Sequence, residues 1–157
     1  MTSAIADLLT GRGAHVLVAN ALEALDLADF GARPAGVPHS IYEELWHLRH
    51  WQDLILDWID GVPTAAPAHA VDGWPCQPTP AGNAEAQALV IAFRAGLERA
   101  CVVASDPRRH AQVVRKGRTV RALLESLLAH NAYHLGRIVL LRQLRGSWPP
   151  PSGGDTW

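Results

Sequence analysis

Cysteine and net charge are both scarce in this chain of 157 residues. The two cysteines, Cys76 and Cys101, stand alone and lack the CxxC spacing of thiol-based metal or redox motifs. We interpret them as reduced thiols, since a small secreted scaffold would show a denser cysteine framework. The formal net charge of -1 provides no general attraction to nucleic acid or to an anionic membrane. We therefore expect neither as a partner.

Long apolar runs are also missing. No run of about 18 apolar residues occurs, so a membrane-spanning helix is not expected. The first residues, MTSAIADLLTGRGAH, lack the basic start and apolar core of a secretion signal. With reduced thiols, these absences predict a cytoplasmic protein. The composition, 48% hydrophobic and 18% charged, is typical of a globular chain, and the length suits a single domain over residues 1–157.

Sustained alternation of apolar and polar residues, the sign of β-strands, is absent from the chain, and we detect no internal repeat. Helical periodicity is present instead. It predicts four helices, at about residues 4–29, 40–60, 84–105 and 119–144. Gly11 and Gly13 mark a candidate break in the first of them, and Gly146 closes the last.

The second helix has the clearest start signal. Ser40 and Glu43, in the stretch SIYE, form a capping box, and Gly61 and Pro63 end the helix. Residues 61–82 then contain five prolines and no helical stripe, which is typical of a long connection. The predicted fold class is therefore all-α, a four-helix bundle with a long proline-rich crossover loop between its second and third helices.

Two histidines in the last helix face its apolar side. His130 and His134 are four positions apart, so their imidazoles lie on one face and can share a metal ion. On the second helix, His47 falls inside the apolar arc, and His50 lies at its edge as the main rival. The competing interpretation is that these are core histidines hydrogen-bonded to carbonyls, with no metal. Three inward imidazoles would instead make an open, catalytic type of metal site.

The chain also resembles a known family. The stretches that carry the resemblance are PHSIYEELWHLRHWQDLILDWI, AHNAYHLGRIVLLRQLRGSWPPPSGGDTW, and the shorter LLTGRGAHV and DGWP. They are similar to the DinB/YfiT-like family of metal-dependent enzymes. The resemblance implies a four-helix bundle in which three histidines hold a divalent ion, commonly zinc or nickel. Transferred by position, these are His47, His130 and His134.

The family resemblance also implies a range of activities. Its relatives include bacillithiol S-transferases and a mycothiol-dependent maleylpyruvate isomerase. This implies a metal-dependent enzyme that acts on a small-molecule substrate with a metal-activated thiol, supplied by a low-molecular-weight thiol co-substrate. A metal-bound water would serve a hydrolase equally well. The alternative is a non-catalytic stress-response bundle that binds a metal or a small molecule.

Four further residues are candidates for roles near this site. His15, in the stretch GAH, and His50 could lie beside the metal or the substrate. Arg137 stands where relatives often have Gln, so it either reaches the mouth of the site or is solvated. Trp46 lies away from the predicted core stripe, and such an aromatic is covered by the long loop or by a second subunit. We expect a homodimer. The proline-rich tail, residues 148–157, should be non-helical and pack across the bundle.

Overall fold

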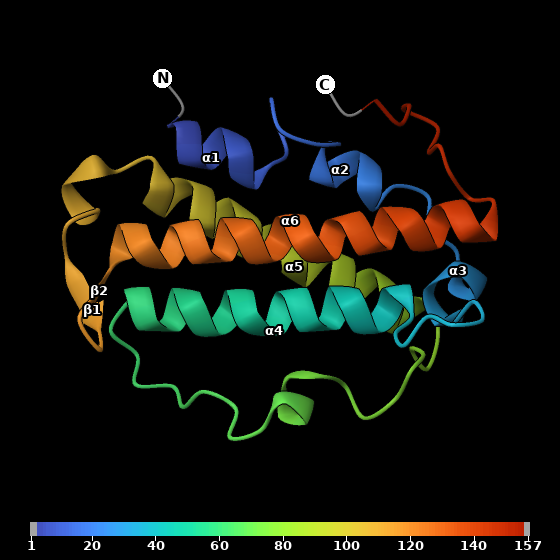
Figure 1. Cartoon of the computed structure of the whole chain (residues 1–157), viewed down its shortest axis with the longest axis horizontal. Helices are drawn as coiled ribbons and strands as arrows, with labels where there is room; N and C mark the ends of the chain where they lie inside the picture. The colour runs from blue at the N-terminus through green and yellow to red at the C-terminus, as the bar shows by residue number, and fades with distance from the viewer. Residues whose placement is uncertain (1–2, 156–157) are drawn as a thin grey trace.

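Three long helices form the body of the protein. The computed structural model describes residues 3–155. Its long helices are α4 (Ile41–Ile59), α5 (Asn83–Ala104) and α6 (Val120–Arg145). Figure 1 shows α4 and α5 running in the same direction and α6 running the opposite way, with the α4–α5 connection passing along the length of the bundle. The predicted all-α fold class is confirmed.

The N-terminal region differs from the expected single helix over residues 4–29. It forms three short helices, α1 (Ala4–Leu9), α2 (Val18–Ala21) and α3 (Leu27–Gly31). The candidate break is confirmed, because Gly11 and Gly13 have φ values of 91° and 74°, outside the helical region. A Cβ atom at Gly11 would lie 2.4 Å from a backbone oxygen, so only glycine fits there. The continuous helix was wrong, but the segment still packs α1 onto α5 and α6.

The start of α4 is fixed by the predicted capping box. The Ser40 hydroxyl accepts from the Glu43 amide at 3.3 Å, and the Glu43 carboxylate accepts from the Ser40 amide at 2.8 Å. Arg33 pairs with the same carboxylate. The Ser40 hydroxyl also donates to the Pro78 carbonyl at 2.6 Å, which anchors the crossover loop. The cap thus sets the register of the residues that follow it in α4.

One β-hairpin was not expected. Strands β1 (Val113–Arg115) and β2 (Arg118–Thr119) pair antiparallel just before α6. Lys116 and Gly117 both have positive φ, 46° and 76°, as a two-residue type I′ turn requires. No sustained alternation marks these strands in the sequence, because strands this short are set by their turn. The loop over residues 61–82 also contains a short 3₁₀ helix, η1 (Ala70–Gly73).

The C-terminal tail returns over the N-terminal region. The buried guanidinium of Arg142 donates to the carbonyls of Ala21 and Ser147, each at 2.9 Å. The Asn20 side chain donates to Gly153 at 3.2 Å, and Figure 1 shows this last segment beside α2. The tail contains no helix as far as it is described, as predicted; Trp157 lies outside the described residues. Among residues 3–155, no helix combines the length and apolar character that crossing a membrane requires.

Candidate metal centre

The structure brings three of the candidate histidines together. His47 comes from α4, and His130 and His134 come from α6. One ring nitrogen from each can be chosen so that the three lie within 4.8 Å of one another. The Nε2 atoms of His47 and His130 are 3.1 Å apart. Because α4 and α6 are packed side by side, residues far apart in the sequence converge on one point (Figure 1).

The crossover loop orients His47. Its Nδ1 lies 2.7 Å from the Gly73 carbonyl, and a carbonyl can only accept, so Nδ1 carries the proton and Nε2 presents its lone pair. Trp74 stacks on the imidazole at 4.0 Å and is itself covered by His39 at 3.7 Å. A Cβ at Gly73 would come within 3.3 Å of Trp51 Nε1, so the loop approaches α4 closely. The imidazole of His47 is therefore fixed in both tautomer and plane.

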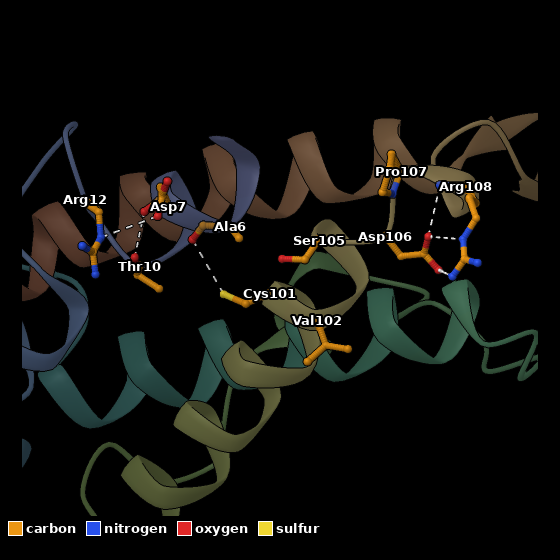
Figure 2. Close-up of a pocket in the computed structure, with 10 residues that line it drawn as sticks. All are labelled: Ala6, Asp7, Thr10, Arg12, Cys101, Val102, Ser105, Asp106, Pro107 and Arg108. Carbon is orange, nitrogen blue, oxygen red and sulfur yellow. Dashed lines mark hydrogen bonds and ion pairs between the residues drawn. The ribbon is translucent and has the colours of Figure 1, made fainter. Parts of the chain in front are cut away.

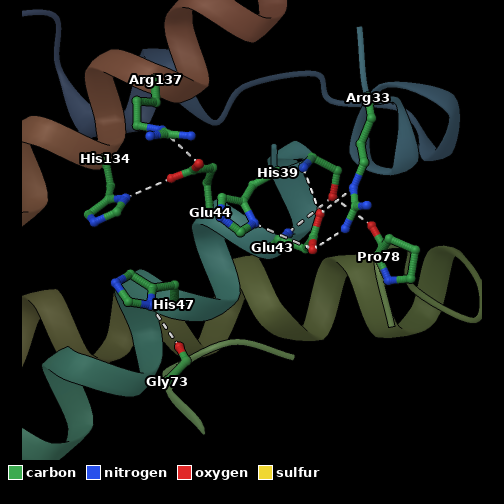
Figure 3. Close-up of polar contacts among 10 residues, drawn as sticks. Arg33, His39, Glu43, Glu44, His47, Gly73, Pro78, His134 and Arg137 are labelled. Carbon is green, nitrogen blue, oxygen red and sulfur yellow. Dashed lines mark hydrogen bonds and ion pairs between the residues drawn. The ribbon is translucent and has the colours of Figure 1, made fainter. Parts of the chain in front are cut away.

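A buried carboxylate orients His134. Figure 3 shows Glu44 between His134 and Arg137: its Oε2 lies 2.6 Å from His134 Nδ1, and its Oε1 lies 2.7 Å from Arg137 Nε. Arg137 balances the charge of Glu44, which is fully buried. Hydrogen bonding through Nδ1 again leaves Nε2 free to bind a ligand, the arrangement that second partners impose on metal-binding histidines.

His130 differs from the other two histidines. Since His47 Nε2 is unprotonated, the 3.1 Å contact requires His130 Nε2 to donate its proton. His130 Nδ1 is then a bare acceptor, and this buried atom has no hydrogen-bond partner. Both polar atoms of the buried Asn131 side chain also lack a hydrogen bond of standard geometry, although Asn131 lies close enough to influence the imidazole. Buried polar atoms without partners are uncommon in folded proteins, and an ion-binding site is one explanation for them.

The two facing imidazoles are neutral at physiological pH. Burial, together with the neighbouring His134, lowers the pKa of His47 to about 4, against a smaller opposite effect of the Gly73 carbonyl. Burial and the adjacent imidazoles lower the pKa of His130 to about 4 as well. Metal binding requires unprotonated nitrogen lone pairs, so these values favour a ligand role. The three imidazoles together could hold a divalent metal ion.

The other candidate residues lie in different places. His50 is stacked on Trp46 with 5.1 Å between ring centroids and is not part of the three-histidine group. His15 lies in the connection from α1 to α2, where its Nδ1 contacts the Val16 carbonyl at 2.8 Å. Arg137 is not simply solvated, since it is bound to Glu44.

The sequence analysis did not identify three residues that contribute to the site. Glu44 lies three positions before His47, so helical spacing could have placed it on a neighbouring face. Gly73 and Trp74 belong to the stretch DGWP, but no role follows from it without the path of the loop. Nothing in the sequence alone would have matched the Gly73 carbonyl with an imidazole of α4.

A surface cavity elsewhere in the protein has weaker chemistry. It measures about 680 Å³, and Figure 2 shows it between α1 and the end of α5, with Cys101 and Arg12 in its wall. The Cys101 thiol donates to the Ala6 carbonyl at 3.7 Å, and burial raises its pKa. A thiol of raised pKa is a poor nucleophile, so this cavity does not rival the histidine cluster. Cys76 is exposed, and both cysteines are free.

Comparison with known families agrees with this geometry. A family model described as the DinB superfamily matches residues 13–138, a range that includes all three histidines. The chain belongs to the DinB superfamily. No curated protein and no solved structure matches it. In this member of the DinB superfamily, the histidine cluster could hold a divalent metal ion.

Proposed function

We propose that this DinB-superfamily chain binds a divalent ion, zinc or nickel, through His47, His130 and His134, and is a metal-dependent enzyme. The reaction we favour joins a low-molecular-weight thiol to a small electrophilic substrate, or isomerises such a substrate. The observation that carries the proposal is the convergence of three imidazoles, two of them fixed through Nδ1 by Gly73 and Glu44. That arrangement prepares ring nitrogens for a metal.

The number of ligands supports a catalytic role. Glu44 is engaged by His134 and Arg137, so it is not available as a fourth ligand. Sites with three protein ligands retain an open position for water or substrate. A bound ion would lower the pKa of a thiol or of water at that position. The residues of the chain hold the imidazoles in place, and the indole of Trp74 shields one face of the site.

A non-catalytic metal-binding bundle is the second candidate. It is favoured by the burial of His47 and His134, which are only 7% and 6% exposed. A buried structural ion would exchange slowly and would not bind added thiols. An enzyme must instead admit its substrate, past His130, which is the more exposed of the three histidines.

Metal content provides the first test. Protein purified without chelator or histidine tag should contain about one divalent ion per chain by elemental analysis. His47→Ala, His130→Ala and His134→Ala should lose it, since removing one of three ligands leaves two. His50→Ala is the matched control from the same helix and should retain the ion. Retention in all three ligand variants would reject the site.

Turnover provides the second test. The metal-loaded protein would be mixed with bacillithiol, mycothiol or glutathione and with monochlorobimane, an electrophile that becomes fluorescent when a thiolate displaces its chloride. We expect conjugation above the spontaneous rate, abolished by chelation and by His130→Ala. Full metal occupancy without any conjugation or hydrolysis would favour the non-catalytic alternative.

A further inference from the structure

We propose that Arg137, supported by Tyr133, forms an anion-binding wall of the histidine site, so that the ligand handled there carries a carboxylate. This inference rests on the proposed function and names the substrate class of the same site. It concerns the contact that orients the ligand, not the reaction at its sulfur or electrophilic carbon.

The guanidinium of Arg137 is held in place, but not all of its N–H donors are engaged. Its Nε binds Glu44 at 2.7 Å, and its Nη1 donates to the Tyr133 hydroxyl at 3.3 Å. A guanidinium carries several N–H donors beyond those two. The side chain is 27% exposed, so part of it remains open to solvent. The guanidinium is planar, so when one edge is held by protein groups the other edge is suited to bind a carboxylate.

Tyr133 places this cation beside the cluster. Its ring meets the His134 imidazole edge-on at 4.9 Å, and the Arg137 guanidinium lies 5.8 Å from the same ring. Tyr133 is 62% exposed, so its ring and hydroxyl are accessible to a ligand. The exposed Tyr133 ring thus contacts both the His134 imidazole and the Arg137 guanidinium.

The charge balance of the site also favours an anion. Glu44 already pairs with Arg137, and the three-histidine group contains no carboxylate. The positive charge of a divalent ion would thus have no compensating side chain among these residues. A ligand that supplies negative charge would be bound more strongly than a neutral one of equal size.

A purely structural role for Arg137 predicts a different result. If Arg137 only neutralises Glu44, its loss would weaken the site for every ligand equally. If it also binds substrate, its loss would weaken carboxylate ligands more than neutral ones. The difference between two matched ligands therefore separates the roles.

The experiment uses the protein loaded with Co²⁺, whose absorption reports both metal binding and thiolate coordination. Dissociation constants would be measured for 3-mercaptopropionate and for its amide, 3-mercaptopropanamide. We expect the carboxylate to bind about tenfold more tightly, the size of one charge-assisted hydrogen bond. Arg137→Gln should abolish that preference, and Arg145→Gln, another arginine of α6 paired with Asp29, should preserve it.

A second variant covers the case in which Arg137→Gln loses the metal or fails to fold. Tyr133→Phe leaves the Glu44 pair intact and removes the hydroxyl that holds Nη1, so the preference should fall about threefold. Equal affinity of wild type for the two thiols, or an unchanged preference in every variant that retains Co²⁺, would overturn this inference and leave metal binding standing. Absence of Co²⁺ binding by the wild type would overturn the proposed function and the inference with it.

Discussion

At the residue scale, His130 is the imidazole whose hydrogen bonding must change when an ion binds. Its Nε2 donates to His47, and its buried Nδ1 has no hydrogen-bond partner. An ion would need the Nε2 lone pair, so the proton would move to Nδ1. The buried side chain of Asn131, which lacks a hydrogen bond of standard geometry and, against the larger effect of burial, raises the pKa of His130, offers an acceptor for that proton.

This leads to a prediction for Asn131→Leu. Replacing a buried amide that lacks partners by an apolar side chain should raise the stability of the metal-free protein by about 1 kcal/mol. The same change removes the acceptor for His130 Nδ1–H and should weaken zinc binding about tenfold. Denaturant unfolding without metal and competition titration with zinc would measure the two effects. A loss of stability with unchanged affinity would show that Asn131 is only a packing residue.

Acid should destabilise the metal-free protein in a defined range. Burial lowers the pKa of His47 and His130 from 6.5 to about 4, so the unfolded chain binds protons there that the folded chain does not. The free energy of unfolding should thus be highest above pH 6.5 and decline as pH falls toward about 4. Denaturant unfolding between these values would test this. The double variant with Gln at both positions should show a shallower decline, and an equal decline would assign the effect to other groups.

At the scale of elements, α4 is held against α5 by a close approach of backbone and side chain. Gln52 is fully buried, and its amide donates to the Phe93 carbonyl at 2.9 Å. Gly96 lies one turn further along α5, and a Cβ atom there would be 2.2 Å from Gln52 Nε2. The absence of a side chain at Gly96 thus permits the contact that sets how α4, which carries His47, lies in the bundle.

Two glycine-to-alanine substitutions should therefore have opposite effects. Gly96→Ala would force Gln52 or α4 to move and should destabilise the protein by about 1–3 kcal/mol. Gly136→Ala, in α6 with no atom within 4 Å of the added Cβ, should stabilise it by about 0.5–1 kcal/mol. Thermal or denaturant unfolding measures both. If the two substitutions shifted stability alike, the close approach at Gly96 would be absent in solution.

At the scale of the whole molecule, the parallel course of α4 and α5 makes the long loop necessary. The connection must return along the bundle, and on its way it carries Gly73 and Trp74 to the face of His47 (Figure 1). A short turn could not do this. The topology thus delivers the part of the site that α4 and α6 cannot supply themselves.

Association between chains is also a property of the whole molecule. Trp46 is stacked on His50 and lines a surface hollow of about 280 Å³. Trp46 and residues of the crossover loop together line a second hollow. We expect this face to form a homodimer, since Trp46 packs against the core and is still only partly buried. Sedimentation at micromolar concentration should show a dimer that Trp46→Ser converts to monomers. A wild-type monomer would mean that the loop alone shields Trp46.

Local rules account for what could be predicted. The capping box fixed the start of α4, and the positions of His130 and His134 on one face of α6 follow from helical spacing alone. The first helix was predicted too long because its apolar spacing persists across Gly11 and Gly13, where the backbone leaves the helical region. The hairpin before α6 was missed because its turn, rather than a periodic pattern, determines it.

The sequence by itself determined the three long helices and which of their faces bear histidines, because those properties depend on neighbours within a few residues. Only the tertiary structure decided what the histidines meet. The partners of His47 and His134 are Gly73, 26 positions away, and Glu44, 90 positions away. No local pattern specifies such pairs, since they arise when packed helices and a returning loop bring distant residues into one buried volume. The convergence of the site is thus a property of packing.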